Sequence, residues 1–371
     1  MDLPWDSSGL LSLLGGPVPT RRTILALSGV ALTGHAWRAL QHPAPTLTAV
    51  AAEQGRVTPP LLAMVESLVA HAQQLDTQNG GAARAFVADQ FAAVARLLRH
   101  ASYPAGTGSR LAAALAQLAQ TSGFMAFDAH HDGEAQRWYL LALRAAHAAQ
   151  DPALSASILA LMSNQAADRG FGLDALQLAS AAQEAAATAG PAVRALVTAR
   201  SGLAHAAAGD LTGFHRMRDA TLELGDSNAD NPLPRWASYL DPVELDAITG
   251  RGLVMIAERL PVRRKQLLGQ ATLLLHARAH TPGTAPPQRS ALRHGAWLSL
   301  AHLRNGDADI AVDTARRALD RLPHVASVRS VALLHRLQEE LTATGPRYPA
   351  PVRQLLAELG RLPRRRDGGV V

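Results

Sequence analysis

Apolar residues recur every three or four positions along most of this chain, and alanine is the commonest of them. Between Pro60 and Gly80, for example, they mark one side of a predicted helix: Leu61, Leu62, Val65, Leu68, Val69 and Leu75. This spacing is typical of a helix with one buried face. Runs of alternating β-branched residues, which would indicate strands, are scarce. The pattern therefore predicts an all-α protein.

The helices of the middle of the chain are expected to come in pairs. Gly123 is followed by Ala135 twelve positions on, by Tyr139 four positions further and by Ala142 three positions further. Small residues at this spacing let two antiparallel helices approach closely, as in tetratricopeptide (TPR) repeats. Three altered copies follow: Ser163, Ala175, Ala179 and Ala182; Ser201, Gly213, Met217 and Ala220; and Ser299, Ala311, Ala315 and Ala318.

Turn residues separate the two helices of each pair. Turns are predicted at 130–133, 170–172, 208–210 and 305–307, where glycine lies beside polar residues. A degenerate unit from Asp241 to about His280 has Pro261 at its turn and Lys265 in the place of the small residue, so its helices must pair differently. The units repeat at intervals longer than the 34 residues of a minimal TPR, which indicates extended helices or enlarged linkers.

The whole chain is predicted to be a TPR-like α-solenoid of stacked antiparallel helix pairs with helical caps. Residues 1–108 form the N-terminal helical cap region, residues 109–324 form about five TPR-like pairs, and residues 325–371 form C-terminal capping helices and a basic tail. The caps would seal the open ends of the array. Further helices are expected over about 22–40, 82–100, 325–341 and 352–359, whereas prolines and glycines break residues 1–19.

Arg21 and Arg22 open a stretch that resembles a twin-arginine export signal, with an apolar run through Leu32 behind them. The run is short, is interrupted by Gly29 and is followed by His35. Because short apolar runs more often belong to a core, we favour an amphipathic helix docked on the repeats. An exported binding protein stays open as the alternative. No stretch reaches the length of a membrane span.

The composition is basic, but no segment is a clear binding site for a polyanion. The net charge is +6, cysteine is absent, and Lys265 is the only lysine. Basic residues cluster at 263–265 and again at Arg361 and 364–366. Such clusters bind phosphates through counterion release, but neither contains aromatic residues that would stack on bases. A solvated helix edge and a tail are the favoured interpretation, and direct nucleic-acid binding is the alternative.

Candidate chemistry is sparse. The densest group of potential metal ligands is His130, His131, Asp132 and Glu134. Near-consecutive turn residues point in different directions, whereas metal ligands must converge, so we expect a hydrated turn and no metal. Neither a Gly-rich phosphate loop after a strand nor a G-x-S-x-G or H-E-x-x-H motif occurs. The prediction is a protein that is not an enzyme and has no cofactor.

The more specific expectation is a partner-binding groove. In TPR-type repeats the first helix of each pair lines the concave side, and the register above assigns nine residues to it: Gln117, Gln120, Phe124, Asp128, Asn164, Asp168, His205, Arg293 and Arg304. Mixed polar and aromatic side chains on an alanine-rich scaffold suit an extended peptide or a protein segment. Each of these side chains could instead pack between helices or face solvent.

The chain also resembles a known family, the actinobacterial TPR transcriptional regulators. The resemblance spans essentially the whole chain and is carried by these segments: Pro4–Trp5, Arg21–Arg22, Gly123–Asp128, Ala135–Arg137, Ala145–Ala148, Met162–Ser163, Gly209–Asp210 and Trp236–Asp241. Family members usually carry an Xre-type helix-turn-helix before the Pro-Trp segment, where this sequence starts. The resemblance therefore implies a cytoplasmic regulator of development or secondary metabolism that binds a protein or peptide and in which direct DNA binding is doubtful. No membrane partner is expected, and a homodimer stays open.

Overall fold

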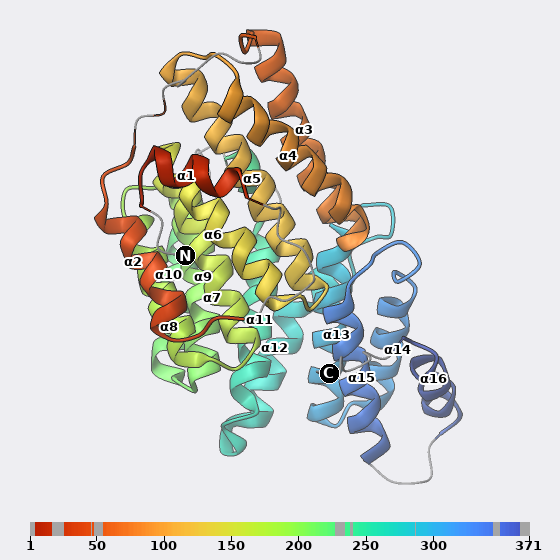
Figure 1. Cartoon of the computed structure of the whole chain (residues 1–371). Helices are drawn as coiled ribbons and strands as arrows, with labels where there is room; N and C mark the ends of the chain where they lie inside the picture. Colours follow the sequence, from red (N-terminus) through yellow and green to blue (C-terminus); the bar gives the residue numbers. More distant parts are fainter. Residues whose placement is uncertain are drawn as a thin grey trace, which may run out of the picture.

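Helices make up this protein in every part of the chain that the structure describes (Figure 1). The computed structural model describes residues 4–16, 26–45, 47, 55–226, 234–237, 240–285, 287–343 and 349–363. Within these ranges it contains sixteen α-helices and three short 3₁₀ helices, with isolated bridges but no β-strand. The prediction of an all-α fold is confirmed.

Five successive helix pairs form the middle of the molecule. Each pair is a hairpin whose two helices pack against each other, and neighbouring pairs stack. The pairs are α5 (Ala105–Asp128) with α6 (Asp132–Ala148), α7 (Pro152–Asp168) with α8 (Gly172–Ala185), α9 (Pro191–Ala208) with α10 (Leu211–Asp226), α11 (Pro242–Ala257) with α12 (Arg264–Ala279), and α13 (Gln288–Asn305) with α14 (Ala308–Leu319). The 3₁₀ helix η3 (Pro261–Arg263) leads into α12. This arrangement is a helical solenoid.

Local residues explain where the helices begin and end. Gly209 and Gly306 follow α9 and α13 in the left-handed region, with φ of +78° and +98°, a conformation that glycine adopts without steric cost. Asp151 and Asp241 cap α7 and α11, because their side chains accept the backbone N–H groups of the first turn. The predicted turns therefore lie where the sequence places them.

Small residues allow the close approach of paired helices. A Cβ atom added at Gly123 would lie 2.7 Å from the ring of Tyr139. In two other pairs a buried serine hydroxyl donates to the carbonyl twelve residues on, from Ser163 to Ala175 (2.8 Å) and from Ser299 to Ala311 (2.7 Å). The same residues that mark the repeat in the sequence thus hold the two helices of a pair together.

The degenerate pair is built differently, as predicted from its lysine. Lys265 is exposed, and the close approach is made by Gly250 of α11, where an added Cβ would lie 2.9 Å from Leu275 of α12.

The N-terminal region packs against the first pairs. Helices α3 (Pro59–Asn79) and α4 (Arg84–His100), joined by η1 (Gly81–Ala83), lie against α5. Two shorter helices, α1 (Ser7–Leu14) and α2 (Val30–Gln41), cross the outer side of the array, where α1 contacts α4 and α6 and α2 contacts α6 and α8 (Figure 1). Docking of the amphipathic segment on the repeats is confirmed for its described part.

Two N-terminal predictions are wrong. The segment 1–19 is not irregular throughout, because Asp6 accepts the N–H of Gly9 (2.8 Å) and starts α1. Of the helix predicted over about 22–40, the described residues 26–29 are not helical, and α2 begins at Val30 after Gly29, which takes a φ of +58°. The Arg21–Arg22 pair lies outside the described residues.

The ends of the solenoid meet. Helix α15 (Val328–Ala343) packs on α13 and touches α5, while α13 touches α3, and α16 (Ala350–Gly360) packs on α14 and α15. The backbone N–H of Ala326 donates to the carbonyl of Asn79 (3.0 Å), and the N–H of Gly81 donates to the carbonyl of Ala326 (3.0 Å). Of the two helices expected to seal the open end, α16 packs on α14 and α15 there, whereas α15 contacts α5. Because Ala326 and α13 also contact the N-terminal region, the array closes on itself.

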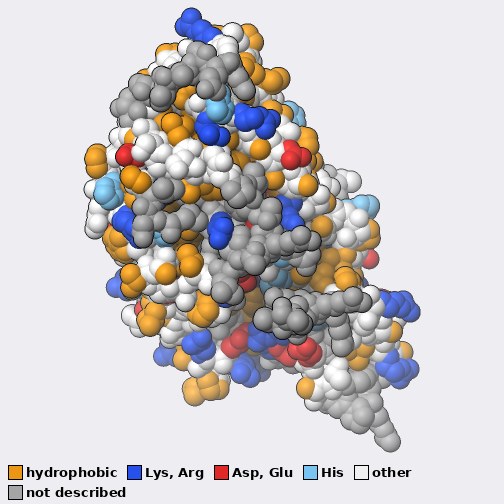
Figure 2. All heavy atoms as spheres, viewed as in Figure 1, with side chains coloured by type: hydrophobic (Ala, Val, Ile, Leu, Met, Phe, Trp, Pro, Cys, Tyr) orange, Lys and Arg blue, Asp and Glu red, His pale blue; other side chains and the backbone are white. Residues whose placement is uncertain are grey.

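The buried apolar residues form two clusters, one extending from Trp5 to Ile248 and the other from Ala206 to Leu359. The boundary between the two clusters falls within helices α9 to α11, inside the predicted repeats. Among the described residues, no helix is both long enough and apolar enough to cross a membrane. On the face shown in Figure 2, arginine and lysine side chains lie in small separate groups among apolar and neutral side chains.

Candidate functional site

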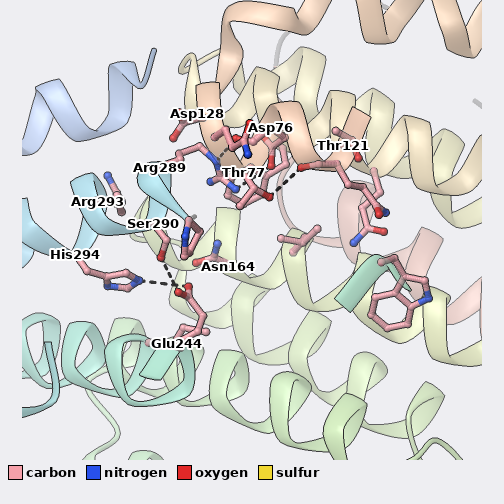
Figure 3. Close-up of a pocket in the computed structure, with 18 of the residues that line it drawn as sticks. Asp76, Thr77, Thr121, Asp128, Asn164, Glu244, Arg289, Ser290, Arg293 and His294 are labelled. Carbon is pink, nitrogen blue, oxygen red and sulfur yellow. Dashed lines mark hydrogen bonds and ion pairs between the residues drawn. The ribbon is translucent and has the colours of Figure 1, made fainter. Parts of the chain in front are cut away.

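The closed array surrounds a cavity of about 600 Å³, which we call the central cavity. Its walls come from the first helices of successive pairs, α5, α7, α9, α11 and α13, completed by α3, Trp236 and Arg329 of α15. Figure 3 shows several of the lining side chains, which converge from helices far apart in the sequence. This position matches the groove that the repeat register predicts.

Five of the nine residues assigned to the groove line this cavity. They are Gln120, Phe124, Asp128, Asn164 and Arg293. Asp168 lies beside it, bonded to Arg251 and Arg293 of the wall. The register of the first helices therefore located most of the cavity.

The other three predicted residues lie elsewhere. Gln117 accepts from Gln73 (3.3 Å) at a smaller neighbouring hollow. His205 lies five residues beyond Arg200, which turns it to another side of α9, where its Nδ1 lies 2.9 Å from Asp210. Arg304 shares a face with Arg293 but is eleven residues, about three turns, further along α13, and it pairs with Glu258 and Glu340. The expectation of one continuous groove through these residues is corrected accordingly.

A buried carboxylate and three guanidiniums form one group of charges at the cavity. Asp168 Oδ1 accepts from Arg251 Nη2 (2.8 Å) and Arg293 Nη2 (2.9 Å), and its Oδ2 lies 3.2 Å from Arg329 Nε. Burial raises the pKa of Asp168, but the charges of the three arginines outweigh it and hold that pKa well below its ordinary value. Asp168 is therefore ionised, and it draws helices α7, α11, α13 and α15 together.

A second group surrounds Glu244 at the start of α11. Ser290 Oγ donates to Glu244 Oε2 (2.6 Å), and His294 Nε2 lies 3.5 Å from Oε1 (Figure 3). Arg278 Nε lies 3.0 Å from Oε2. Burial raises the pKa of Glu244, yet His294, Arg278 and Ser290 lower it to about 2. Burial also lowers the pKa of His294, so this pair is a carboxylate beside a neutral imidazole at neutral pH.

This group does not have the order of a hydrolase triad. In a triad the histidine contacts both the nucleophile and the acid. Here Glu244 stands between Ser290 and His294, and both side chains are bonded to it and not to each other. The arrangement is suited to holding polar groups in place.

A third group closes the cavity between α3 and α13. Arg289 donates to Asp76 Oδ2 (2.8 Å) and to the Asp76 carbonyl (2.9 Å), and its guanidinium carbon lies 4.2 Å from the centre of the Phe124 ring. Burial raises the pKa of Asp76 to about 6, while Arg289 opposes and the nearby Asp128 adds to this shift. Phe124 thus belongs to the wall through a cation–π contact.

Sequence reasoning missed several lining residues for an identifiable reason. Asp76 belongs to a helix assigned to the cap, and Arg329 lies beyond the last predicted groove residue. Arg289 lies one turn before the predicted Arg293 on α13 and was not assigned to the groove. A weak signal was available in Arg200 and Arg251, since each interrupts an apolar helix stretch and is buried in the structure. Arginine is rarely buried unless it is paired, so it indicates a polar interior.

The turn residues weighed as metal ligands are divided among different partners. Arg84 contacts both His131 and Glu134, while Asp132 accepts from Gln165 and pairs with Arg169, so these turn residues face different partners. Among the described residues, no group of three or more His, Asp or Glu side chains is arranged to hold a metal ion.

The basic residues 263–265 are exposed at the start of α12, and Arg361 is exposed after α16. Residues 364–366 lie outside the described part of the chain.

Comparisons of this chain with protein-family models, with curated proteins and with solved structures found no match.

Proposed function

We propose that this protein is a non-enzymatic, cytoplasmic regulator that binds a peptide or a segment of a protein partner in the central cavity. By its resemblance to the actinobacterial TPR regulators, the regulated process would be transcription in development or secondary metabolism. The observation that carries the proposal is the cavity itself, whose walls come from the first helices of successive pairs and hold charged, amide and aromatic side chains.

The size of the cavity favours a short ligand. A volume of about 600 Å³ lies within the range of pockets that hold small molecules. Because the array closes through Asn79, Gly81 and Ala326, a long extended peptide has no continuous open groove to lie in. A chain end or a loop of a few residues fits this geometry better.

The test is occlusion of the cavity. Ala70 is an exposed residue of α3 that lines the cavity, so Ala70→Trp places an indole in it without disturbing the core. Ala63→Trp, on an exposed position of the same helix outside the cavity lining, is the matched control. Partners are captured from the native host with the wild-type protein, identified by mass spectrometry, and remeasured as purified segments.

Wild type and Ala63→Trp should bind such a segment equally, and Ala70→Trp should bind it at least about tenfold more weakly. Equal affinity in all three proteins would exclude the cavity as the binding site.

Two alternatives make separate predictions. Exposure of the basic residues 263–265 leaves room for a nucleic-acid contact at the start of α12, and this predicts an affinity that falls steeply with salt. Export predicts that the native chain isolated from its host begins after residues 21–22. Neither alternative uses the central cavity, so neither predicts an effect of Ala70→Trp.

A further inference from the structure

The amide side chains around the central cavity differ from its carboxylates in how they are bonded. The carboxylates of Asp76, Asp168 and Glu244 each contact at least one arginine side chain. Gln74 and Gln78 also line the cavity, but their side-chain amides make no hydrogen bond among the described residues. The polar groups that a ligand can use therefore include uncharged amides.

Asn164 presents an oriented donor to the cavity. It lines the cavity and is 6% exposed (Figure 3). Its Oδ1 accepts from Arg251 Nη1 (3.0 Å). Because a guanidinium can only donate, this bond fixes which end of the amide faces Arg251. The Nδ2 group of Asn164 points away from Arg251 and finds no acceptor among the described residues. Asn164 can therefore donate to an oxygen atom of a ligand.

Helix α3 adds a row of polar side chains to the cavity wall. Five of its residues line the cavity at the spacing of one helix face: Ala70, Gln73, Gln74, Thr77 and Gln78. Gln74 and Gln78 are four residues apart, which places them roughly 6 Å apart along the helix axis. Two residues of an extended peptide span roughly 6.6 Å. The spacing of the two amides therefore matches the spacing of alternate peptide units.

The hydrogen-bonding groups of these amides complement a peptide main chain. Each peptide unit has one N–H donor and one carbonyl acceptor, and a side-chain amide has both kinds of group as well. Asn164 offers donors, whereas Gln74 and Gln78 can donate or accept. Bringing uncharged groups out of water also costs less than bringing out charges, so such contacts suit a partly buried site.

We propose that the central cavity binds the main chain of its peptide ligand through these amides. Asn164 donates to a main-chain carbonyl, and Gln74 and Gln78 pair with alternate peptide units. This inference rests on the proposed function for the identity of the ligand as a peptide. In this arrangement the ion pairs hold the walls in place, and the amides contact the ligand. Recognition then depends little on the ligand's side chains.

The probe is acetyl-tetraalanine-amide, which has no charge and only methyl side chains. Its main chain is therefore all that can form hydrogen bonds in the cavity. Ester analogues replace one peptide N–H at a time with oxygen, which removes a donor and weakens the neighbouring carbonyl as an acceptor. Calorimetric titration measures the affinity of wild type and of two variants for each of these compounds.

The two variants make the same chemical change at different places. Asn164→Asp keeps the oxygen that accepts from Arg251 and replaces the donor that faces the cavity with an acceptor. Gln183→Glu replaces an amide with a carboxylate on an exposed position of α8, outside the cavity lining. It is the matched control.

Wild type and Gln183→Glu should bind the probe equally. Asn164→Asp should bind it at least about tenfold more weakly, because a carboxylate oxygen then faces the carbonyl of the ligand. In wild type, the ester at one or more positions should weaken binding about three- to tenfold. The ester that removes the partner of Asn164 should cost less in Asn164→Asp, where this hydrogen bond is already lost.

The outcomes separate this inference from the proposed function. Failure of the probe to bind wild type at millimolar concentration, unchanged affinity of every ester analogue, or unchanged affinity of Asn164→Asp would each overturn the main-chain site. If Ala70→Trp still weakens the captured partner segment in that case, the cavity remains its binding site. If Ala70→Trp leaves the segment unaffected but the probe distinguishes Asn164→Asp from Gln183→Glu, the main-chain site stands and the proposed function fails.

Discussion

Arg289 donates two hydrogen bonds to Asp76, 213 residues away in the sequence, one to the carboxylate (2.8 Å) and one to the backbone carbonyl (2.9 Å). Three residues beyond Asp76, the backbone of residues 79–81 bonds to Ala326. These contacts join the two ends of the solenoid. They turn the concave side of the array into the central cavity.

The first prediction concerns pH and Asp76. Burial raises its pKa from the ordinary 3.8 to about 6 in the folded protein. The folded state therefore holds the proton more tightly than the unfolded chain, and the stability from this group is present below about pH 4 and is lost as the pH rises through about 6. The shift corresponds to up to about 3 kcal/mol.

Urea unfolding of wild type and Asp76→Asn between pH 4 and 7.5 measures this effect. The free energy of unfolding of wild type should fall relative to that of the variant across this range. Asp89→Asn, an exposed carboxylate of α4, controls for the loss of a charge. Parallel profiles for wild type and Asp76→Asn would show that Asp76 does not titrate in this way.

Closure of the array depends on Gly80. Its φ of +64° and ψ of −139° strain any other residue, and an added Cβ would lie 2.3 Å from the carbonyl oxygen of Ala326. Gly29 has nearly the same backbone angles but open space around it. We expect Gly29→Ala to cost about 1–3 kcal/mol from backbone strain, and Gly80→Ala to cost at least about 1 kcal/mol more because of the clash.

Chemical denaturation and hydrogen exchange at residues 79–81 and 326 check the role of Gly80. Gly80→Ala should also increase exchange at these amides. Equal losses of stability in the two variants would show that contact with Ala326 adds nothing.

The serine bridges inside the pairs should each contribute to stability. Ser163 and Ser299 donate to carbonyls of the partner helix, whereas the buried Ser201 donates to Val197 of its own helix. Ser163→Ala and Ser299→Ala should each cost about 1 kcal/mol. Ser201→Ala should cost less, because a bond back to the same helix competes with helix geometry. Chemical denaturation measures the difference through the midpoints, provided that the denaturant dependence of the free energy of unfolding is unchanged. A larger loss of stability in Ser201→Ala than in the other two variants would refute this account.

Gly123 is expected to tolerate no side chain. An added methyl group would lie 2.7 Å from the Tyr139 ring and 3.2 Å from the Cβ of Trp138, so Gly123→Ala should cost about 1–3 kcal/mol through overpacking. Gly269 of α12 has no atom within 4 Å of the same position, and Gly269→Ala should stabilise the protein by about 0.5–1 kcal/mol. Thermal unfolding of both variants tests the pair. A stabilising Gly123→Ala would contradict the packing described for α5 and α6.

The sequence by itself determined the elements that depend on nearby residues. The helix pairs and their turns follow from the 3.6-residue period and from glycines such as Gly209 and Gly306, whose conformation is set within one turn of helix. The inner face of the first helices follows in the same way, and five residues assigned to it line the cavity: Gln120, Phe124, Asp128, Asn164 and Arg293. The local prediction failed at α1, where the cap formed by Asp6 starts a helix that the neighbouring prolines and glycines had argued against.

Tertiary structure alone decided that the array closes. Each helix pair is rotated relative to the one before it, and irregular linkers join the pairs. The sum of these rotations cannot be predicted from any local sequence pattern. Only this sum brings Arg289 to Asp76, and gathers Arg200, Arg251 and Arg329 around Asp168 and the cavity. Burial then shifts the pKa values, because the same arginines that would be solvated on an open surface are buried beside the cavity.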